Sequence, residues 1–250
     1  MGSKLISLLT SWPANTVRLV GVLRRAGYSA ALVDHYRRAG WLQSIGPGAV
    51  IRKGDQVNYL GALYALQTQA NLDVHLGGLS ALELRGRAHF LRKGRPNIHI
   101  FGTAAKLPSW TRKADLRAEI QYHSTKLFPK KFDFSLMEHN TGSYKILISG
   151  AVSAMLELLY LTPMQHSFEE GRQLMEGLAG EHPQAVERIL MNCNSIKAKR
   201  LFLLLAEACG HRWLNQLDVT KFDLGSGRRS LIRGGVYNKK YKLVIPRNII

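Results

Sequence analysis

Residues 27–53 limit the possible folds more than any other stretch of the sequence. Ser29 is a favourable helix N-cap, because its hydroxyl accepts a hydrogen bond from a free N–H of the first turn. Gly40 stands where such a helix would end, since glycine readily takes the left-handed conformation that closes helices. The pattern therefore predicts one short helix over residues 30–39.

The predicted helix has one side to bury and one side to present. With a period of 3.6 residues, apolar side chains gather on one side and polar ones on the other. The side expected to pack consists of Leu32, Val33, Tyr36 and Ala39, and the opposite side of Ala31, Asp34, His35 and Arg38.

Two strand-like segments follow the helix. Residues 41–45 and 49–53 are joined by Gly46-Pro47-Gly48, a composition typical of a tight turn. The second segment ends in two basic residues, Arg52 and Lys53. A helix followed by such a hairpin is typical of a winged helix-turn-helix.

The presented side of the helix suits a DNA major groove. The small Ala31 permits close approach near the helix N-terminus, and the basic side chains extend toward base edges or phosphates. The alternative is an ordinary helix in a small domain, with Asp34 simply paired to Arg38. The residues predicted to contact DNA are Ser29, Ala31, His35, Arg37, Arg38, Arg52 and Lys53.

The rest of the chain predicts an α+β protein of two domains. Two supporting helices, over residues 5–9 and 14–26, complete a winged helix-turn-helix domain over residues 1–54. Residues 55–250 form a larger mixed α/β domain, in which residues 55–95 are a candidate connecting subregion. Within that subregion we expect helices over residues 57–70 and 78–86 with a strand at 74–76, and then a hairpin that pairs residues 88–91 with 97–101.

The charge of the chain points to a polyanionic partner. The formal net charge is +18 over 250 residues. Basic blocks over residues 1–54, 85–131 and 193–250 carry +7, +10 and +9, and they alternate with two acidic blocks. Nucleic acid is the default partner for such a chain.

Other classes of protein are less favoured. Cys193 and Cys209 are the only cysteines and show no metal-ligand spacing, so we expect free thiols, no metal site and a cytoplasmic location. The apolar run before Trp12 is too short for a signal peptide, and polar residues interrupt the most apolar segment, so no membrane span is expected. We find no catalytic motif and expect neither catalytic residues nor a cofactor.

Two basic clusters near the C-terminus are candidate anion sites. A strongly apolar helix predicted over residues 195–209 carries three cations at its start, the end where the helix dipole disfavours them. Two arginines follow Gly225-Ser226-Gly227, which we interpret as a turn. The candidate anion-binding or antitoxin residues are Lys197, Lys199, Arg200, Arg228 and Arg229.

The sequence resembles AbiEi-type antitoxins over nearly its full length. The resemblance is carried by the GWL-to-wing pattern at 40–52, GLSALELRG at 78–86, CNSIKAKRLFLLLAE at 193–207 and DLGSGRRSL at 223–231. It implies a type IV antitoxin of abortive phage defence whose winged helix binds an operator inverted repeat and represses its own operon. It also implies that the C-terminal domain neutralises a nucleotidyltransferase-like toxin without a stable complex. The alternatives from charge alone are an RNA- or tRNA-binding protein and a DNA-processing enzyme that use the basic C-terminal blocks.

The chain departs from that family at one place. Where the family usually has a Ser-Pro-Glu-Arg-Ala-like stretch before a long helix, this sequence has Gly150-Ala151-Val152-Ser153-Ala154. The acid and the base of the family stretch are therefore both missing here.

Overall fold

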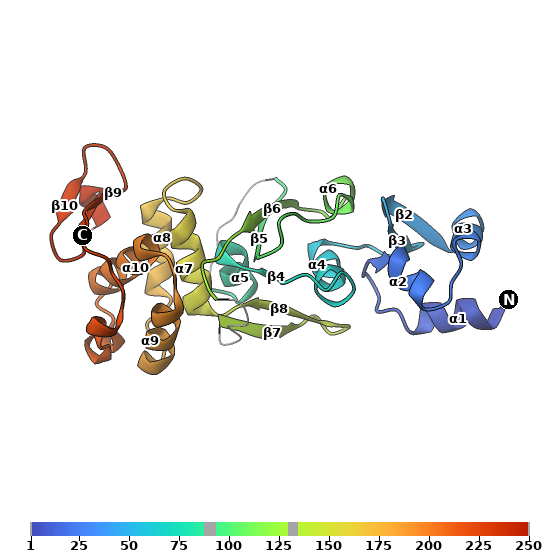
Figure 1. The fold of residues 1–250 in the computed structure, drawn as a ribbon, viewed down its shortest axis with the longest axis horizontal. Coiled ribbons are helices and arrows are strands. Elements are labelled where there is room, and N and C mark those ends of the chain that lie inside the picture. The colour runs from blue at the N-terminus through green and yellow to red at the C-terminus, as the bar shows by residue number, and fades with distance from the viewer. Residues whose placement is uncertain (1, 88–93, 130–134, 250) are drawn as a thin grey trace. The chain divides into compact units, whose positions relative to one another are not determined.

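The computed structural model describes residues 2–87, 94–129 and 135–249 (Figure 1). The chain forms two compact units, each assembled from three separate stretches. Unit 1 comprises residues 1–76, 91–124 and 138–148, and unit 2 comprises residues 77–90, 125–137 and 149–250.

Unit 1 begins with a winged helix-turn-helix. Its elements are α1 (Gly2–Thr10), β1 (Arg18–Leu19), α2 (Val20–Arg25), α3 (Ala30–Arg38), β2 (Leu42–Gly46) and β3 (Ala49–Arg52). The strands form a sheet in the order β1-β3-β2. Apolar side chains from α1, α2, α3 and the wing meet in one core, whose buried members include Leu8, Trp12, Leu23, Tyr36 and Val50.

The second supporting helix is shorter than the sequence predicts. The prediction of a helix over residues 14–26 is wrong in its first half, because α2 begins only at Val20. Asn15 adopts a positive φ of 56°, and its side-chain oxygen accepts from the Gln56 N–H at 2.9 Å. The chain then runs extended through β1, which pairs antiparallel with β3. Long-range strand pairing therefore overrides the local helical pattern.

A five-stranded sheet follows the winged helix along the chain. Its order is β6-β5-β4-β8-β7, with β4 and β8 parallel and β4 and β5 antiparallel. The strands are β4 (Val74–Leu76), β5 (Asn97–Gly102), β6 (Glu119–Ser124), β7 (Leu136–Asn140) and β8 (Lys145–Ser149). The predicted hairpin falls partly outside the described residues, since residues 88–93 are not among them.

Helix α4 (Tyr59–Thr68) is fixed to both the sheet and the winged helix, all within unit 1. The Gln67 amide donates to the carbonyl oxygens of Val74 at 2.9 Å and Leu147 at 3.0 Å. Gly61 faces the turn at Asn15 so closely that a Cβ there would collide with the Asn15 carbonyl oxygen. A short helix, α6 (Trp110–Lys113), lies between β5 and β6 in the sequence.

Unit 2 is built around two buried helices. Helix α7 (Ala151–Leu161) has ten of its eleven residues buried, and α10 (Ile196–Ala208) packs against it. A helix that is apolar on all sides is stable only when other elements surround it. The surrounding helices are α5 (Gly78–Leu84), α8 (Phe168–Glu176) and α9 (Pro183–Asn192).

The C-terminal segment of unit 2 is mostly irregular. It contains the short helices η2 (Arg212–Gln216), η3 (Val219–Lys221) and η4 (Arg247–Ile249) and a small sheet in the order β10-β11-β9. The strands are β9 (Arg229–Ser230), β10 (Val236–Asn238) and β11 (Leu243–Ile245). Within the part of the chain that is described, no helix has the length and apolarity needed to cross a bilayer.

Candidate nucleic-acid interface

Helix α3 is formed as its sequence predicts. The Ser29 hydroxyl accepts from the Leu32 N–H at 3.2 Å, which satisfies one free donor of the first turn. Gly40 adopts a φ of 76°, and the Trp41 N–H after it bonds the Tyr36 carbonyl oxygen at 2.9 Å. This left-handed closure ends the helix where a side chain would be strained.

The two sides of α3 separate as expected, with one exception. Val33 and Tyr36 are buried in the core of the winged helix, and Leu32 is half-buried. Ala39 was expected to pack but is exposed, because it lies at the end of the helix, beyond the apolar core. The exposed side carries Ala31, Asp34, His35, Arg37 and Arg38.

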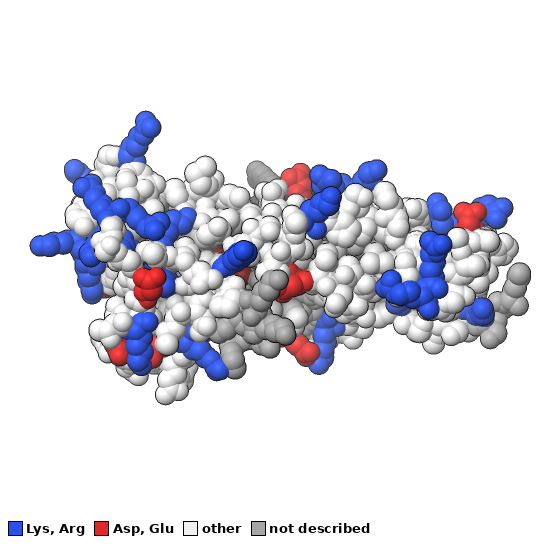
Figure 2. Space-filling model, viewed as in Figure 1, with Lys and Arg blue, Asp and Glu red and all other residues white. Residues whose placement is uncertain are grey.

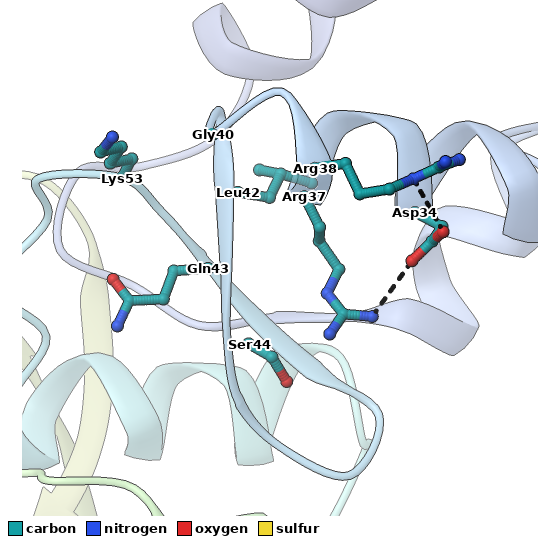
Figure 3. A pocket seen from close by; sticks show the side chains of 8 residues that line it. All are labelled: Asp34, Arg37, Arg38, Gly40, Leu42, Gln43, Ser44 and Lys53. Atoms are coloured by element: carbon teal, nitrogen blue, oxygen red, sulfur yellow. Dashed lines mark ion pairs between the residues drawn. The ribbon is translucent and has the colours of Figure 1, made fainter.

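Asp34 holds both arginines of α3 on the exposed side. Its two carboxylate oxygens lie 3.6 Å from Arg37 Nη1 and 3.2 Å from Arg38 Nε (Figure 3). Side-chain exposures are 46% for Arg37, 74% for Arg38 and 53% for Asp34, so solvent screens these pairs. Exposed pairs of this kind contribute about 0–1 kcal/mol, so a phosphate could replace Asp34 as their partner at little cost.

The wing lies beside α3 and leaves a groove between them. The groove is open, has a volume of about 420 Å³ and lies within unit 1. Lys53, in the turn directly after β3, contributes a third cation and lies close to Gly40 at the end of α3. Figure 3 shows the eight residues that line it: Asp34, Arg37, Arg38, Gly40, Leu42, Gln43, Ser44 and Lys53.

Arg52 is not available for a phosphate as the sequence suggested. Its guanidinium donates to Asp55 at 3.1 Å and to the Leu9 carbonyl oxygen at 3.0 Å. The ion pair is mostly shielded, with side-chain exposures of 21% and 14%. Arg52 therefore ties the wing to α1, and Lys53 is the wing cation that faces solvent.

Two of the predicted C-terminal anion ligands are also buried. Lys199 and Arg200 are 3% and 1% exposed, because α10 is covered on nearly every side. Arg200 donates to four carbonyl oxygens, those of Leu224, Gly225, Gly227 and Lys242. The prediction that these two cations bind an anion is wrong: Arg200 anchors the loop that precedes β9, and Lys199 is enclosed in unit 2.

The remaining three candidates stay closer to the surface. Arg228 and Arg229 are exposed, and the Arg228 guanidinium lies 4.8 Å from the centre of the Tyr237 ring. Lys197 is half-buried, and its ammonium donates to the carbonyl oxygens of Tyr160 at 2.5 Å and Thr162 at 2.6 Å. Figure 2 shows Lys and Arg side chains gathered over the part of unit 2 that contains β9 and β10.

Metal ligands are not grouped in the described parts of the chain. No cluster of three or more His, Cys, Asp or Glu side chains occurs among them, and both cysteines are free thiols. His99 is buried, with Nδ1 2.9 Å from His123 Nε2, which agrees with a structural role.

A winged helix-turn-helix with a cation-lined groove beside its exposed helix defines a class of nucleic-acid-binding regulators. Two family models place the chain within that class. One, described as the N-terminal domain of the AbiEi antitoxin, a transcriptional regulator, matches residues 1–93. The other, described as "Transcriptional regulator, AbiEi antitoxin, Type IV TA system", matches residues 95–246. The protein belongs to the AbiEi antitoxin family of transcriptional regulators of type IV toxin–antitoxin systems.

A solved structure supports the fold. The RV2827C protein from Mycobacterium tuberculosis is similar over 96% of this chain and 89% of its own, with a TM-score of 0.60 and 15% sequence identity. At that identity the likeness concerns the fold alone. No curated protein sequence matches the chain significantly.

Proposed function

We propose that the protein binds an inverted repeat in the operator of its own operon and thereby represses transcription. The observation that carries this proposal is the exposed side of α3, where Ala31, His35 and Arg38 follow one another at helical spacing and Arg38 also lines the groove beside the wing. Ala31 leaves room for the helix to enter a major groove, and the basic side chains of α3 meet base edges. Lys53 meets a phosphate from the wing.

The two-fold symmetry of an inverted repeat calls for two copies of the protein. Each winged helix would occupy one half-site, and the spacing of half-sites would follow the helical repeat of DNA. A complex of two chains per duplex is therefore the expected stoichiometry.

We propose further that antitoxin action resides beyond Gly54 and acts in the cytoplasm against a nucleotidyltransferase-like toxin, without a stable complex. The family description supports the antitoxin role, and the resemblance noted above supports the class of toxin and abortive phage defence. The operator-binding surface proposed above lies in residues 29–53, so the rest of unit 1 and all of unit 2 remain for the second activity.

The operator proposal is tested by fluorescence anisotropy on the duplex upstream of the gene, with a scrambled duplex and tRNA as competitors. Arg38→Ala should lower specific affinity, since one base contact contributes about 1–3 kcal/mol of discrimination. Lys53→Ala should weaken binding to both duplexes and flatten the log–log salt slope by roughly 0.9. Arg212→Ala, an exposed change in unit 2, is the matched control and should bind as the parent does.

Two results would contradict the operator proposal. If Arg38→Ala binds operator and scrambled duplex as tightly as the parent, α3 is not the DNA-contacting helix. If tRNA competes better than the operator duplex, the alternative of an RNA-binding protein is favoured.

We assign regulation and no catalysis to the protein. The rival is a DNA-processing enzyme, which would need carboxylates that hold a metal ion. Incubating purified protein with plasmid or tRNA and Mg²⁺ or Mn²⁺ tests the rival: cleavage that a single carboxylate substitution abolishes would establish it.

A further inference from the structure

Unit 2 contains a second basic cavity, distinct from the groove in the winged helix. It has a volume of about 340 Å³ and is formed by residues 125–127, the end of α7, the start of α10 and β9. The three cations that line it come from three separate segments. They are Lys126, Lys197 and Arg229.

The positive charge of this cavity is not neutralised within the described residues. None of its three basic side chains takes part in an ion pair there, and the Arg229 side chain makes no hydrogen bond there. The pKa of Lys197 is lowered by burial first and by the positive charge of Arg229 second. Two like charges that act on each other in this way repel, and a bound anion would relieve the repulsion.

The walls of the cavity are fixed by hydrogen bonds to backbone carbonyl oxygens. The Asn194 N–H donates to the Leu127 carbonyl oxygen at 2.8 Å, and its side-chain amide donates to the Lys126 carbonyl oxygen at 2.7 Å. Lys197 is held by its two bonds to the end of α7. Walls held in this way lose little conformational entropy on binding, and only the exposed side chains of Lys126 and Arg229 would have to become ordered.

An exposed aromatic ring accompanies the cations. Tyr160 lines the cavity and is 39% exposed, although every other residue of α7 is buried. Its ring centre lies 5.6 Å from Lys197 Nζ. Cations beside an exposed aromatic side chain are a combination found in sites for unpaired nucleotides, because the base stacks on the ring while the phosphate is neutralised.

We propose that this cavity binds a phosphorylated nucleotide, with the phosphate between Arg229 and Lys126 and the base against Tyr160. The volume is within the range of small-ligand sites. A base inside a duplex cannot stack on a side chain, so the nucleotide is either free or at the end of a single strand. The site lies in unit 2 and does not depend on operator binding by unit 1.

The test uses the full-length protein and two fluorescent probes, a ribose-labelled nucleoside 5′-monophosphate and a short single-stranded oligonucleotide. Arg229→Ala should weaken binding about tenfold, since a charge-assisted contact to phosphate is lost. Arg233→Ala removes the same charge from an exposed site outside the cavity. Because salt screens exposed charges that do not contact the ligand, this variant should change the affinity less than about twofold. Lys126→Ala, also exposed, provides a second variant with the same expected loss.

Each outcome decides between the proposal and diffuse electrostatics. Saturable binding that Arg229→Ala and Lys126→Ala weaken, but Arg233→Ala does not, supports the cavity. Binding of both probes then identifies a free nucleotide, and binding of the oligonucleotide alone identifies a strand end. Failure of both probes to saturate, or equal loss in all three variants, overturns the proposal. Arg229→Ala should still bind the operator as the parent does, which would show that its loss of nucleotide binding does not arise from the function proposed for unit 1.

Discussion

Arg200 is buried on α10 and donates to the carbonyl oxygens of Leu224, Gly225 and Gly227. Burial lowers its pKa, and nearby Arg229 adds to the effect by repulsion. The bonds to loop carbonyls compensate for removing the guanidinium from water. Arg200, one of the three cations at the start of the predicted helix, therefore stabilises the loop before β9.

Replacing Arg200 should destabilise the protein strongly. Arg200→Met keeps the length of the side chain but removes its hydrogen bonds to several part-buried carbonyl oxygens, and a bond from a charged donor contributes about 1.5–3 kcal/mol. We expect a loss of roughly 3 kcal/mol or more in the free energy of unfolding, measured by urea denaturation. Arg212→Met, on an exposed residue of the same unit, should stay within about 0.5 kcal/mol of the parent.

The two cysteines should differ in reactivity. Burial raises the pKa of the Cys193 thiol to about 11, and it also raises the pKa of Cys209, which is less buried. In a thiol-labelling assay at pH 8 we expect the less buried Cys209 to be labelled first. Cys193 should be labelled only after unfolding, because the thiolate is the reactive form and burial disfavours it. Rapid labelling of both would contradict the burial of Cys193.

The raised pKa of Cys193 also gives a pH dependence with a definite sign. The pKa of the Cys193 thiol is higher in the folded protein than in the unfolded chain, so its contribution to the free energy of unfolding is fully present below about pH 9. That contribution is lost as the pH rises toward 11. The same denaturation assay should show the parent losing more stability over this range than Cys193→Ala.

At the scale of elements, α3 has two roles: it packs into the core of the winged helix, and it presents the side chains proposed to contact DNA. Ser29 caps the helix, and the same helix end carries Ala31 on the exposed side. Its neighbours Val33 and Tyr36 fix the helix to the core, so the exposed side chains are presented from a rigid support. One substitution at Ser29 can therefore change DNA binding while leaving the stability of the helix unchanged.

Ser29→Asp should keep the stability of the protein while weakening operator binding. Asp caps helices about as well as Ser, so the free energy of unfolding should change by less than about 0.5 kcal/mol. The new carboxylate would repel the phosphates, and we expect at least a tenfold loss of operator affinity by anisotropy. Ser29→Ala is the matched control for the cap and should lose about 1 kcal/mol of stability. Operator affinity equal to that of the parent would show that this helix end does not face DNA.

At the scale of the whole molecule, the net charge of +18 is shared between two units with separate basic sites. The groove beside α3 belongs to unit 1, and the cavity lined by Lys197 and Arg229 belongs to unit 2. Charge alone pointed to a polyanion but did not distinguish one site from two. We therefore expect the two proposed activities, operator binding by the groove and antitoxin action beyond Gly54, to be separable by mutation.

Full-length Arg38→Ala should lose repression and keep antitoxin action. Repression is measured with a reporter under the upstream promoter, and antitoxin action by growth during co-expression with the neighbouring toxin. Arg212→Ala should keep both activities, and immunoblotting should show equal amounts of each variant. Loss of both activities by folded Arg38→Ala would refute the separation.

The sequence by itself determined α3 and the wing, because their determinants are local, whereas the start of α2 depends on the pairing of β1 with β3. A capping serine, an amphipathic period and a glycine at the helix end specify α3, and a glycine-rich turn specifies the wing. The exposed side of α3 was likewise predictable, because Val33 and Tyr36 mark the side that packs into the core and the opposite side then faces solvent. Family motifs extended the prediction to the antitoxin class.

Tertiary structure alone decided which charged residues remain accessible. Helix α10 is apolar on nearly all sides, so its periodicity could not show that Lys199 and Arg200 would be enclosed by other elements. Arg52 likewise depends on Asp55 and Leu9, whose positions follow from the packing of α1 against the wing. The cavity lined by Lys126, Lys197 and Arg229 joins segments far apart in the chain. Local patterns fix how each element forms, whereas exposure depends on which other elements cover it.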